Sequence, residues 1–443
     1  MTEIIELEIR DINSHGNGVG ELDKLVYFVE GATLGEICKA EVIKKKKSYA
    51  MAKKIETVKE SPYLAKPKCK YFGKCTGCVL QDVEYSEQLE LKKKSVIDKL
   101  NRLAGEDIED IEIISMGDPY FYRNKIELKV SEASKLGYYG RGTHRHVEID
   151  ECVIASEEIN NVIPKIQEIL DKYKIPGYNN RKNSGVIKNV TIRSNYKGQI
   201  QLTITFATNR FKNQNDFLED LEKIEEIAEL HKSINTNRRD ESMGDRTKLI
   251  YENSIFSDKI GDLEFIISPK SFFQVNKENT RKLYDEAVEQ MQLKENEKIL
   301  DLYSGIGTIP NYISKYVKSV DGVEIVKDAV KDAEINSEIN KLENIKIYLG
   351  KSEKHVKDLI LQKNYDAVIV DPPRKGLEEE IIHTIGNSEI KKIQYISCDP
   401  ATLARDIKAL KEYGFKISKI KACDMFPQTI HVETVVLMSR VEK

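Results

Sequence analysis

The stretch "DLYSGIGT", residues 301–308, decides the fold of this chain, because it joins an apolar strand-like run to the start of a helix-like run. A glycine-rich turn in that place lets the backbone come close to a ligand. The dinucleotide-binding fingerprint would require a third small residue where this chain has Pro310. A pyrophosphate ligand is therefore disfavoured.

Acidic residues stand at the ends of the strands expected around this turn. Asp301 ends the first strand, Glu324 ends the next one, and Asp371 opens the loop "DPPRKG". A carboxylate at Glu324 can accept hydrogen bonds from both hydroxyls of an unphosphorylated ribose, and the prolines fix the loop so that Asp371 faces the site. Taken in order, these features resemble an S-adenosylmethionine-dependent methyltransferase over residues 270–443.

Strand-like and helix-like runs alternate from Ser268 to the end of the chain. Such alternation is typical of a parallel, doubly wound α/β sheet, in which ligands bind at the carboxyl ends of the strands. Helices are predicted at residues 277–292, 308–317, 326–340, 377–386 and 401–413.

The preceding residues indicate two further regions. Short strand-like runs and glycine turns in residues 2–58 predict a small β-barrel of about five strands. Helical spacing predicts a helix at 84–103, and the mixed pattern from 120 to 266 predicts an α+β domain with helices near 156–172 and 214–231. We therefore expect domains at residues 1–60, 61–265 and 266–443, with the helix at 84–104 able to pack against the third.

Composition excludes several classes of protein. The 443 residues are 40% apolar and 32% charged, the balance of a soluble globular protein. No apolar run reaches the roughly 18 residues of a membrane span, and the charged start "MTEIIELEIR" does not resemble a signal peptide. We expect a cytoplasmic monomer. Its net charge is −3, but lysine-rich runs at 39–54 and 66–74 flank a cysteine cluster and favour a polyanion partner.

A cysteine precedes a helix-like run in "SCDPATLARDI", residues 397–407. Asp399 is a suitable N-cap and Pro400 suits the first helical position. Cys398 is therefore expected at a helix N-terminus, where the dipole would favour the thiolate and lower its pKa. Glu433, in "HVETVVLM", places a carboxylate at the mouth of a strand that reads as buried, as either a structural pair or a working base.

These two side chains suit methylation at carbon 5 of uracil. That carbon is a poor nucleophile until a thiolate adds to carbon 6, and a base must later remove the carbon 5 proton before the thiolate can leave. We assign the nucleophile to Cys398 and the base to Glu433.

The motifs FFQVN, DLYSGIGT, GVE, DPPRKG, SCDPATLARD and HVETV, in this order, closely resemble the RNA 5-methyluridine methyltransferases of the TrmA/RumA type. The resemblance implies that Cys398 is the nucleophile and Glu433 the base, and that Arg374 and His431 help to orient the uracil or a phosphate. It also implies an S-adenosyl-L-methionine site formed by Gln274, Tyr303, Gly305, Thr308, Glu324 and Asp371.

A second cysteine pattern occupies "CKYFGKCTGC", residues 69–78, with Cys152 far downstream. Three clustered thiols and a distant fourth fit metal–thiolate chemistry, and the spacing leaves zinc and a [4Fe-4S] cluster open. The family resemblance implies a [4Fe-4S] cluster, which would hold a basic loop in place for RNA contact. Its ligands would be Cys69, Cys75, Cys78 and Cys152.

The resemblance extends to the partner. Residues 1–60 resemble a TRAM domain, an OB-like barrel that binds RNA. The expected fold class is thus α/β, a Rossmann-like methyltransferase domain preceded by this barrel and by a central α+β iron–sulfur domain. Barrel and cluster together favour 23S rRNA, while transfer RNA stays open. Side chains suited to base stacking and phosphate contacts, or to packing, are Tyr122, Arg123, Tyr138, Tyr139 and Arg141.

Two other functions fit less well. Cytosine C5-methyltransferases also use a cysteine, but theirs lies in the loop after strand four, where this chain has DPPR. An RNA-binding protein without activity would not need both Cys398 and Glu433.

Overall fold

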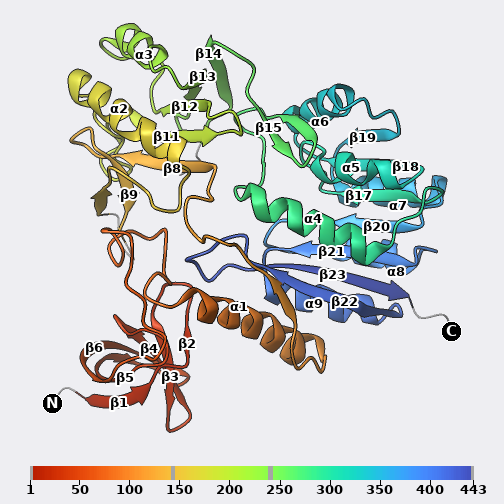
Figure 1. Cartoon of the computed structure of the whole chain (residues 1–443), viewed down its shortest axis with the longest axis horizontal. Coiled ribbons are helices and arrows are strands. Elements are labelled where there is room, and N and C mark those ends of the chain that lie inside the picture. Colours follow the sequence, from red (N-terminus) through yellow and green to blue (C-terminus); the bar gives the residue numbers. More distant parts are fainter. Residues whose placement is uncertain (1–2, 141–144, 238–242, 441–443) are drawn as a thin grey trace.

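The computed structural model describes residues 3–140, 145–237 and 243–440. Figure 1 shows three large sheets that follow one another along the chain, with the N-terminal sheet at the lower left and the C-terminal sheet at the right. Within the described ranges, no helix combines the length and the apolar character needed to cross a membrane.

The N-terminal sheet has six strands in the order β1-β5-β6-β4-β3-β2. Its two edge strands are separated in the chain by only Ile9 and Arg10, so the sheet must curl. The N–H of Arg10, which connects β1 to β2, donates to the Val19 carbonyl of β3 at 2.8 Å. No strand pairing among the described residues closes the sheet. The expected closed barrel is therefore not established. The strands are β1 (Ile4–Glu8), β2 (Asp11–Ile12), β3 (Gly18–Leu22), β4 (Leu25–Glu30), β5 (Ile37–Lys45) and β6 (Tyr49–Lys59).

The central sheet has seven strands in the order β10-β9-β8-β11-β12-β13-β14 and packs against helices α2 (Glu157–Tyr173) and α3 (Gln214–Glu222). The helix predicted at 214–231 is wrong in its second half, because residues 227–234 form strand β13, parallel to β12. Burial of Ile227 and Leu230 in this sheet overrides the local helical spacing. The strands are β8 (Lys125–Val130), β9 (Leu136–Tyr139), β10 (His146–Glu148), β11 (Ile187–Ser194), β12 (Ile200–Phe206), β13 (Ile227–Ile234) and β14 (Arg246–Glu252).

The C-terminal sheet confirms the predicted Rossmann-like α/β architecture. Strands β19-β18-β17-β20-β21 are parallel, and β23, β22 and β7 (Glu112–Ile114) complete the order, with β23 antiparallel to both β21 and β22. The strands are β17 (Lys298–Leu302), β18 (Ser319–Glu324), β19 (Ile345–Leu349), β20 (Ala367–Val370), β21 (Lys392–Ser397), β22 (Phe415–Cys423) and β23 (Glu433–Arg440). A hairpin of β15 (Ser257–Ile260) and β16 (Leu263–Ile266) precedes them.

Helices cover both faces of this sheet (Figure 1). One of them, α7, was not predicted, because its short lysine-rich sequence buries only Val356 and Leu359 among its apolar residues. The helices are α4 (Lys277–Met291), α5 (Thr308–Ile313), α6 (Lys327–Ile339), α7 (Ser352–Gln362), α8 (Glu379–Gly386) and α9 (Pro400–Lys411).

Residues from far upstream complete the C-terminal sheet. Helix α1 (Tyr85–Lys99) continues in a π-helical turn to Ala104, and strand β7 (Glu112–Ile114) then pairs with β22 at the edge of the sheet. Val96 and Leu100 of this segment lie in the same apolar core as Leu403 of α9. The C-terminal fold is therefore built from two stretches of the chain.

Candidate active site

Sequence-predicted site residues converge at the carboxyl edge of the C-terminal sheet. Asp371 directly follows β20 and Cys398 directly follows β21, while Glu433 opens β23. Because β23 is antiparallel to β21, with Ser397 opposite Thr434, the next pair along the register brings Cys398 beside Glu433. On the other side of Glu433, the same register places Cys423 of β22.

The glycine loop is tied to the neighbouring strand by Glu324. Its two carboxylate oxygens accept hydrogen bonds from the N–H groups of Gly305 at 2.9 Å and Val326 at 2.7 Å. Gly307 has φ +78°, and a Cβ atom there would lie 3.1 Å from Ala333, so glycine is required. The loop thus presents backbone at the strand ends, and Glu324 keeps lone pairs for further donors.

Other residues predicted to contact the cofactor lie around this loop. Tyr303 has φ +70°, and its buried hydroxyl has no hydrogen-bond partner among the described residues. Thr308 opens α5 with its hydroxyl 3.0 Å from that of Tyr284. Gln274 is buried just before α4, and its carbonyl accepts from the Asn124 side chain at 3.2 Å.

Buried carboxylates dominate the electrostatics of this edge. Burial raises the pKa of Asp301 to about 8, with Asp371 and Glu324 adding to the effect. Neither carboxylate oxygen of Asp301 has a partner in the described part of the chain. Burial also raises the pKa of Asp371 and of Glu433, and Asp371 raises that of Glu433 further. Because a nearby positive charge lowers the pKa of such acids and favours their ionised form, the site suits a ligand that carries positive charge, and S-adenosylmethionine, with its sulfonium and ammonium groups, fits it.

The expected lowering of the Cys398 pKa is wrong. Burial, followed by Glu433 and Asp371, raises the pKa of this thiol to about 12. Asp399 is the N-cap of α9, as predicted, and its carboxylate accepts from the N–H groups of Ala401 and Thr402 at 2.9 Å each. These donors are therefore not available to the sulfur, and burial together with the nearby carboxylates outweighs the helix dipole.

Arg374 and His431 flank the same edge. The exposed Arg374 side chain opposes the upward shifts in the pKa of Cys398 and of Glu433. Burial, then Arg374, lowers the pKa of His431, whose ring meets Phe426 edge-on at 6.1 Å between centroids. His431 is thus expected to be neutral near pH 7.

The other predicted ligands lie together in the central region. Cys69, Cys75, Cys78 and Cys152 line one cavity of about 430 Å³. The N–H groups of Tyr71 and Gly77 point at the sulfurs of Cys69 and Cys75, at 3.4 and 3.3 Å. Among the described residues, no group of three or more His, Cys, Asp or Glu side chains is arranged to hold a single metal ion.

Residues singled out for stacking on RNA have mixed surroundings. Tyr122 is buried, and its hydroxyl donates to the Pro427 carbonyl at 3.1 Å, so it packs rather than stacks. Arg123 donates to the Lys125 carbonyl at 2.8 Å. Tyr138 and Tyr139 pair with β10, and Arg141 lies outside the described residues.

Sequence reasoning missed the polar part of helix α1. Its buried face carries Gln88, Lys92 and Val96 at intervals of four residues. The signal was present, since a glutamine and a lysine continue the helical stripe of Val96 and Leu100.

Known proteins match this chain over most or all of its length. The family model described as tRNA (uracil-5-)-methyltransferase matches residues 84–441. Uncharacterised RNA methyltransferases of Clostridium acetobutylicum and Bacillus cereus are 38% and 36% identical to this chain, cover 99% and 100% of it, and are each covered over 97% of their length. The crystal structure of Pyrococcus abyssi tRNA (uracil-54, C5)-methyltransferase with S-adenosyl-L-homocysteine superposes with a TM-score of 0.78. It is 28% identical, over 99% of this chain and 100% of that one.

The charge on Asp301 should set part of the pH dependence of stability. Because its folded pKa of about 8 exceeds the ordinary 3.8, the folded state keeps a proton that the unfolded state has lost between those values. The free energy of unfolding then falls with rising pH by about 1.4 kcal/mol per pH unit from this group. Asp301→Asn should remove that slope in urea unfolding of the unliganded protein at pH 5.5, 6.5 and 7.5.

Asp262, exposed in the turn between β15 and β16, supplies the matched control as Asp262→Asn, which should follow the wild-type profile. If the free energy of unfolding changes with pH by the same amount in wild type and in Asp301→Asn, burial does not raise the pKa of Asp301.

Proposed function

The chain belongs to the tRNA (uracil-5-)-methyltransferase family, and from that premise we propose that it methylates carbon 5 of a uridine with Cys398 as nucleophile and Glu433 as general base. One observation carries the proposal. The strand register pairs Ser397 with Thr434, and so sets Cys398 beside Glu433 at the carboxyl edge of the sheet.

The proposed cofactor-binding residues are Gln274, Tyr303, Gly305, Thr308, Glu324 and Asp371. Support comes from the Tyr303 hydroxyl and the Asp301 carboxylate, which are buried beside the glycine loop and have no hydrogen-bond partner among the described residues. S-adenosylmethionine supplies a methyl group on a positively charged sulfur. Asp301 and Asp371 would hold that charge against the strand ends, and Glu324 would accept from the ribose.

The proposed steps balance around Cys398 and Glu433. The Cys398 sulfur bonds to carbon 6 of the uracil, and the ring electrons move toward carbon 5. Carbon 5 then accepts the methyl group, whose bond to the cofactor sulfur breaks. Glu433 takes the proton from carbon 5, the ring double bond re-forms and the carbon–sulfur bond breaks. Since Cys398 has a raised pKa, its proton must pass to solvent before addition. Arg374, which opposes the raised pKa of both Cys398 and Glu433, and the positive charge of the cofactor would favour the thiolate and the Glu433 carboxylate that these steps need.

Two substitutions separate these roles. Cys398→Ala should abolish the covalent complex with RNA containing 5-fluorouridine, because no sulfur remains to add to carbon 6. Glu433→Gln should still add and methylate but should accumulate a methylated protein–RNA adduct with ordinary uridine. Denaturing gels with labelled RNA measure both. An adduct with Cys398→Ala, or normal turnover by Glu433→Gln, would refute the corresponding role.

We propose 23S rRNA as the substrate, with residues 1–60 as an OB-like RNA-binding barrel. The curled N-terminal sheet and the four-cysteine cavity support this choice, since their joint presence resembles the ribosomal enzymes of the family. Exposed lysines at the turn between β5 and β6, Lys44 to Lys47, suit a phosphate backbone. Transfer RNA is a second candidate, favoured by the whole-chain similarity to the Pyrococcus abyssi tRNA enzyme.

Methylation of purified RNAs decides between the two substrates. Unmodified 23S rRNA and a tRNA transcript, incubated separately with enzyme and methyl-labelled cofactor, should show label in the rRNA, with 5-methyluridine located by mass spectrometry. Label confined to the tRNA would reject the ribosomal assignment and establish the second candidate.

We further propose that Cys69, Cys75, Cys78 and Cys152 hold a [4Fe-4S] cluster. The four residues line one cavity, and four cysteine thiolates are the ligand set of such a cluster. The cluster would be structural, joining the loop 69–78 to Cys152.

Anaerobically purified protein should therefore be brown and contain about four irons and four sulfides per chain. Cys152→Ser should lower the iron content and the melting temperature, because one ligand is lost. Cys38→Ala is the matched control, since Cys38 is buried in the N-terminal core and does not line the cavity. A colourless protein with one zinc per chain would contradict the cluster.

A further inference from the structure

The loop between β22 and β23, residues 424–432, leads directly into Glu433. Connecting loops usually run over the surface, but Asp424, Met425, Pro427 and Gln428 in this loop are buried. Gln428 also has φ +68°, a conformation that non-glycine residues seldom adopt. Such a loop must be held by its surroundings.

Helix α1 holds the start of the loop through a buried ion pair. The Lys92 ammonium lies 2.5 Å from the Asp424 carboxylate, and the two side chains are 1% and 0% exposed. Lys92 also donates to the Phe426 carbonyl at 3.0 Å, and the Tyr85 hydroxyl donates to Asp424 at 2.8 Å. Because a buried ion pair adds little stability over an apolar pair, its use here indicates a need for one defined loop geometry.

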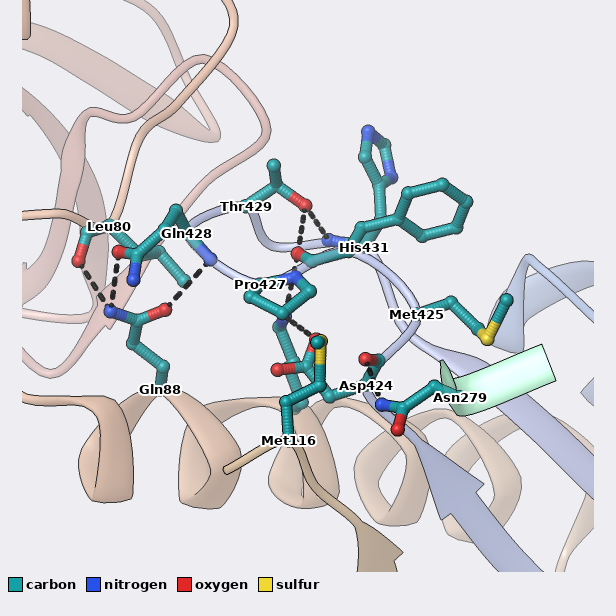
Figure 2. A network of polar contacts seen from close by, with 12 residues as sticks. Leu80, Gln88, Met116, Asn279, Asp424, Met425, Pro427, Gln428, Thr429 and His431 are labelled. Carbon is teal, nitrogen blue, oxygen red and sulfur yellow. Dashed lines mark hydrogen bonds and ion pairs between the residues drawn. The ribbon is translucent and has the colours of Figure 1, made fainter. Parts of the chain in front are cut away.

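One turn earlier on α1, Gln88 holds the middle of the loop. Its side-chain carbonyl accepts from the Gln428 N–H at 3.1 Å, and its amide donates to the Gln428 side chain at 3.0 Å and to the Leu80 carbonyl at 2.8 Å (Figure 2). The N–H groups of Val79 and Leu80 in turn donate to the Gln428 carbonyl at 3.0 and 3.1 Å. Residues 79–80 directly follow Cys78, so the loop is bound to the end of the cysteine segment.

Two further elements complete the hold. From α4, Asn279 donates to the Asp424 carbonyl at 2.7 Å (Figure 2). Asn276, the N-cap of α4, donates to the Met425 carbonyl at 3.2 Å. From the central region, Tyr122 donates to the Pro427 carbonyl. By contrast, Cys398 is carried by β21 and α9 and makes none of these contacts.

We propose that Gln88 and Lys92 are positioning residues, which hold the β22–β23 loop so that Glu433 meets the proton on carbon 5. The hydrogen bonds of Gln428 also join this loop to the segment that follows Cys78. This inference rests on the proposed function. Loosening the loop should slow proton removal while leaving addition by Cys398 and methyl transfer nearly unchanged. A loss of stability alone would slow all three steps together.

Gln88→Leu tests the inference with two labels in one reaction. The RNA carries tritium on carbon 5 of its uridines, and the cofactor carries a labelled methyl group. In a single turnover, with enzyme in excess over RNA, methyl transfer should proceed at nearly the wild-type rate, whereas tritium release should slow by ten- to a hundredfold, the order of magnitude expected for a misplaced catalytic group. A methylated protein–RNA adduct should accumulate.

Gln167→Leu is the matched control. Gln167 of α2 also accepts from a backbone N–H, that of Leu136 at 2.8 Å, and donates to a carbonyl, that of Ser134 at 3.0 Å, but the loop it holds does not lead to the site. In Gln167→Leu, the rates of methyl transfer and of tritium release should both stay at the wild-type level. Equal rates of methyl transfer and tritium release in Gln88→Leu would overturn the inference.

Tyr122→Phe covers the case in which Gln88→Leu does not fold. It removes one hydrogen bond from the loop and keeps the ring, and it should slow tritium release alone by a smaller factor; unchanged release would overturn the inference. Glu433→Gln separates the two levels of the argument. Normal tritium release by Glu433→Gln refutes the proposed function, while slow release by Glu433→Gln with normal release by the α1 and Tyr122 variants refutes only the positioning role.

Discussion

The hydrogen-bonded register of β23 is the constraint on which the site depends. It is antiparallel to β21 on one side and to β22 on the other, and it opens with Glu433 between Cys398 and Cys423. Side chains alternate along a strand, so a slip of one residue would turn Glu433 to the opposite face. The buried loop that enters β23 from Asp424 fixes where the strand begins, and this register therefore relies on contacts made by α1 and α4.

The electrostatics of the site follow from the same geometry. Parallel strands bring Asp301 and Asp371 to one edge, and the antiparallel strand adds Glu433. Burial favours the protonated form of each and keeps Cys398 a thiol. Without a ligand, these carboxyl groups therefore favour the protonated form at the place where a cationic ligand would put its positive charge. Binding and activation are linked, because a positive charge that stabilises the carboxylates also makes the thiolate easier to form.

Much of this arrangement could be predicted from the sequence, because strongly patterned segments carry their own signals. The alternation after Ser268 predicted the C-terminal sheet, and acids or a cysteine at strand ends predicted which side chains gather there. Long-range packing could not be predicted. Residues 227–234 have helical spacing, yet pairing with β12 makes them a strand. The pKa of Cys398 was misjudged because the helix start was visible in the sequence, whereas the burial of the sulfur and the carboxylates around it were not.

The segment of residues 85–114 has a consequence for how the protein is made. Lys92 meets Asp424 across 332 positions of sequence, and β7 pairs with the late strand β22. Contacts of such separation close large loops and form slowly. On the ribosome, helix α1 emerges long before its partners and must wait with its apolar stripe uncovered until the last strands are synthesised. The C-terminal fold is therefore completed only near the end of translation, and chaperones that shield helix α1 in the meantime would matter more for this chain than its modular appearance suggests.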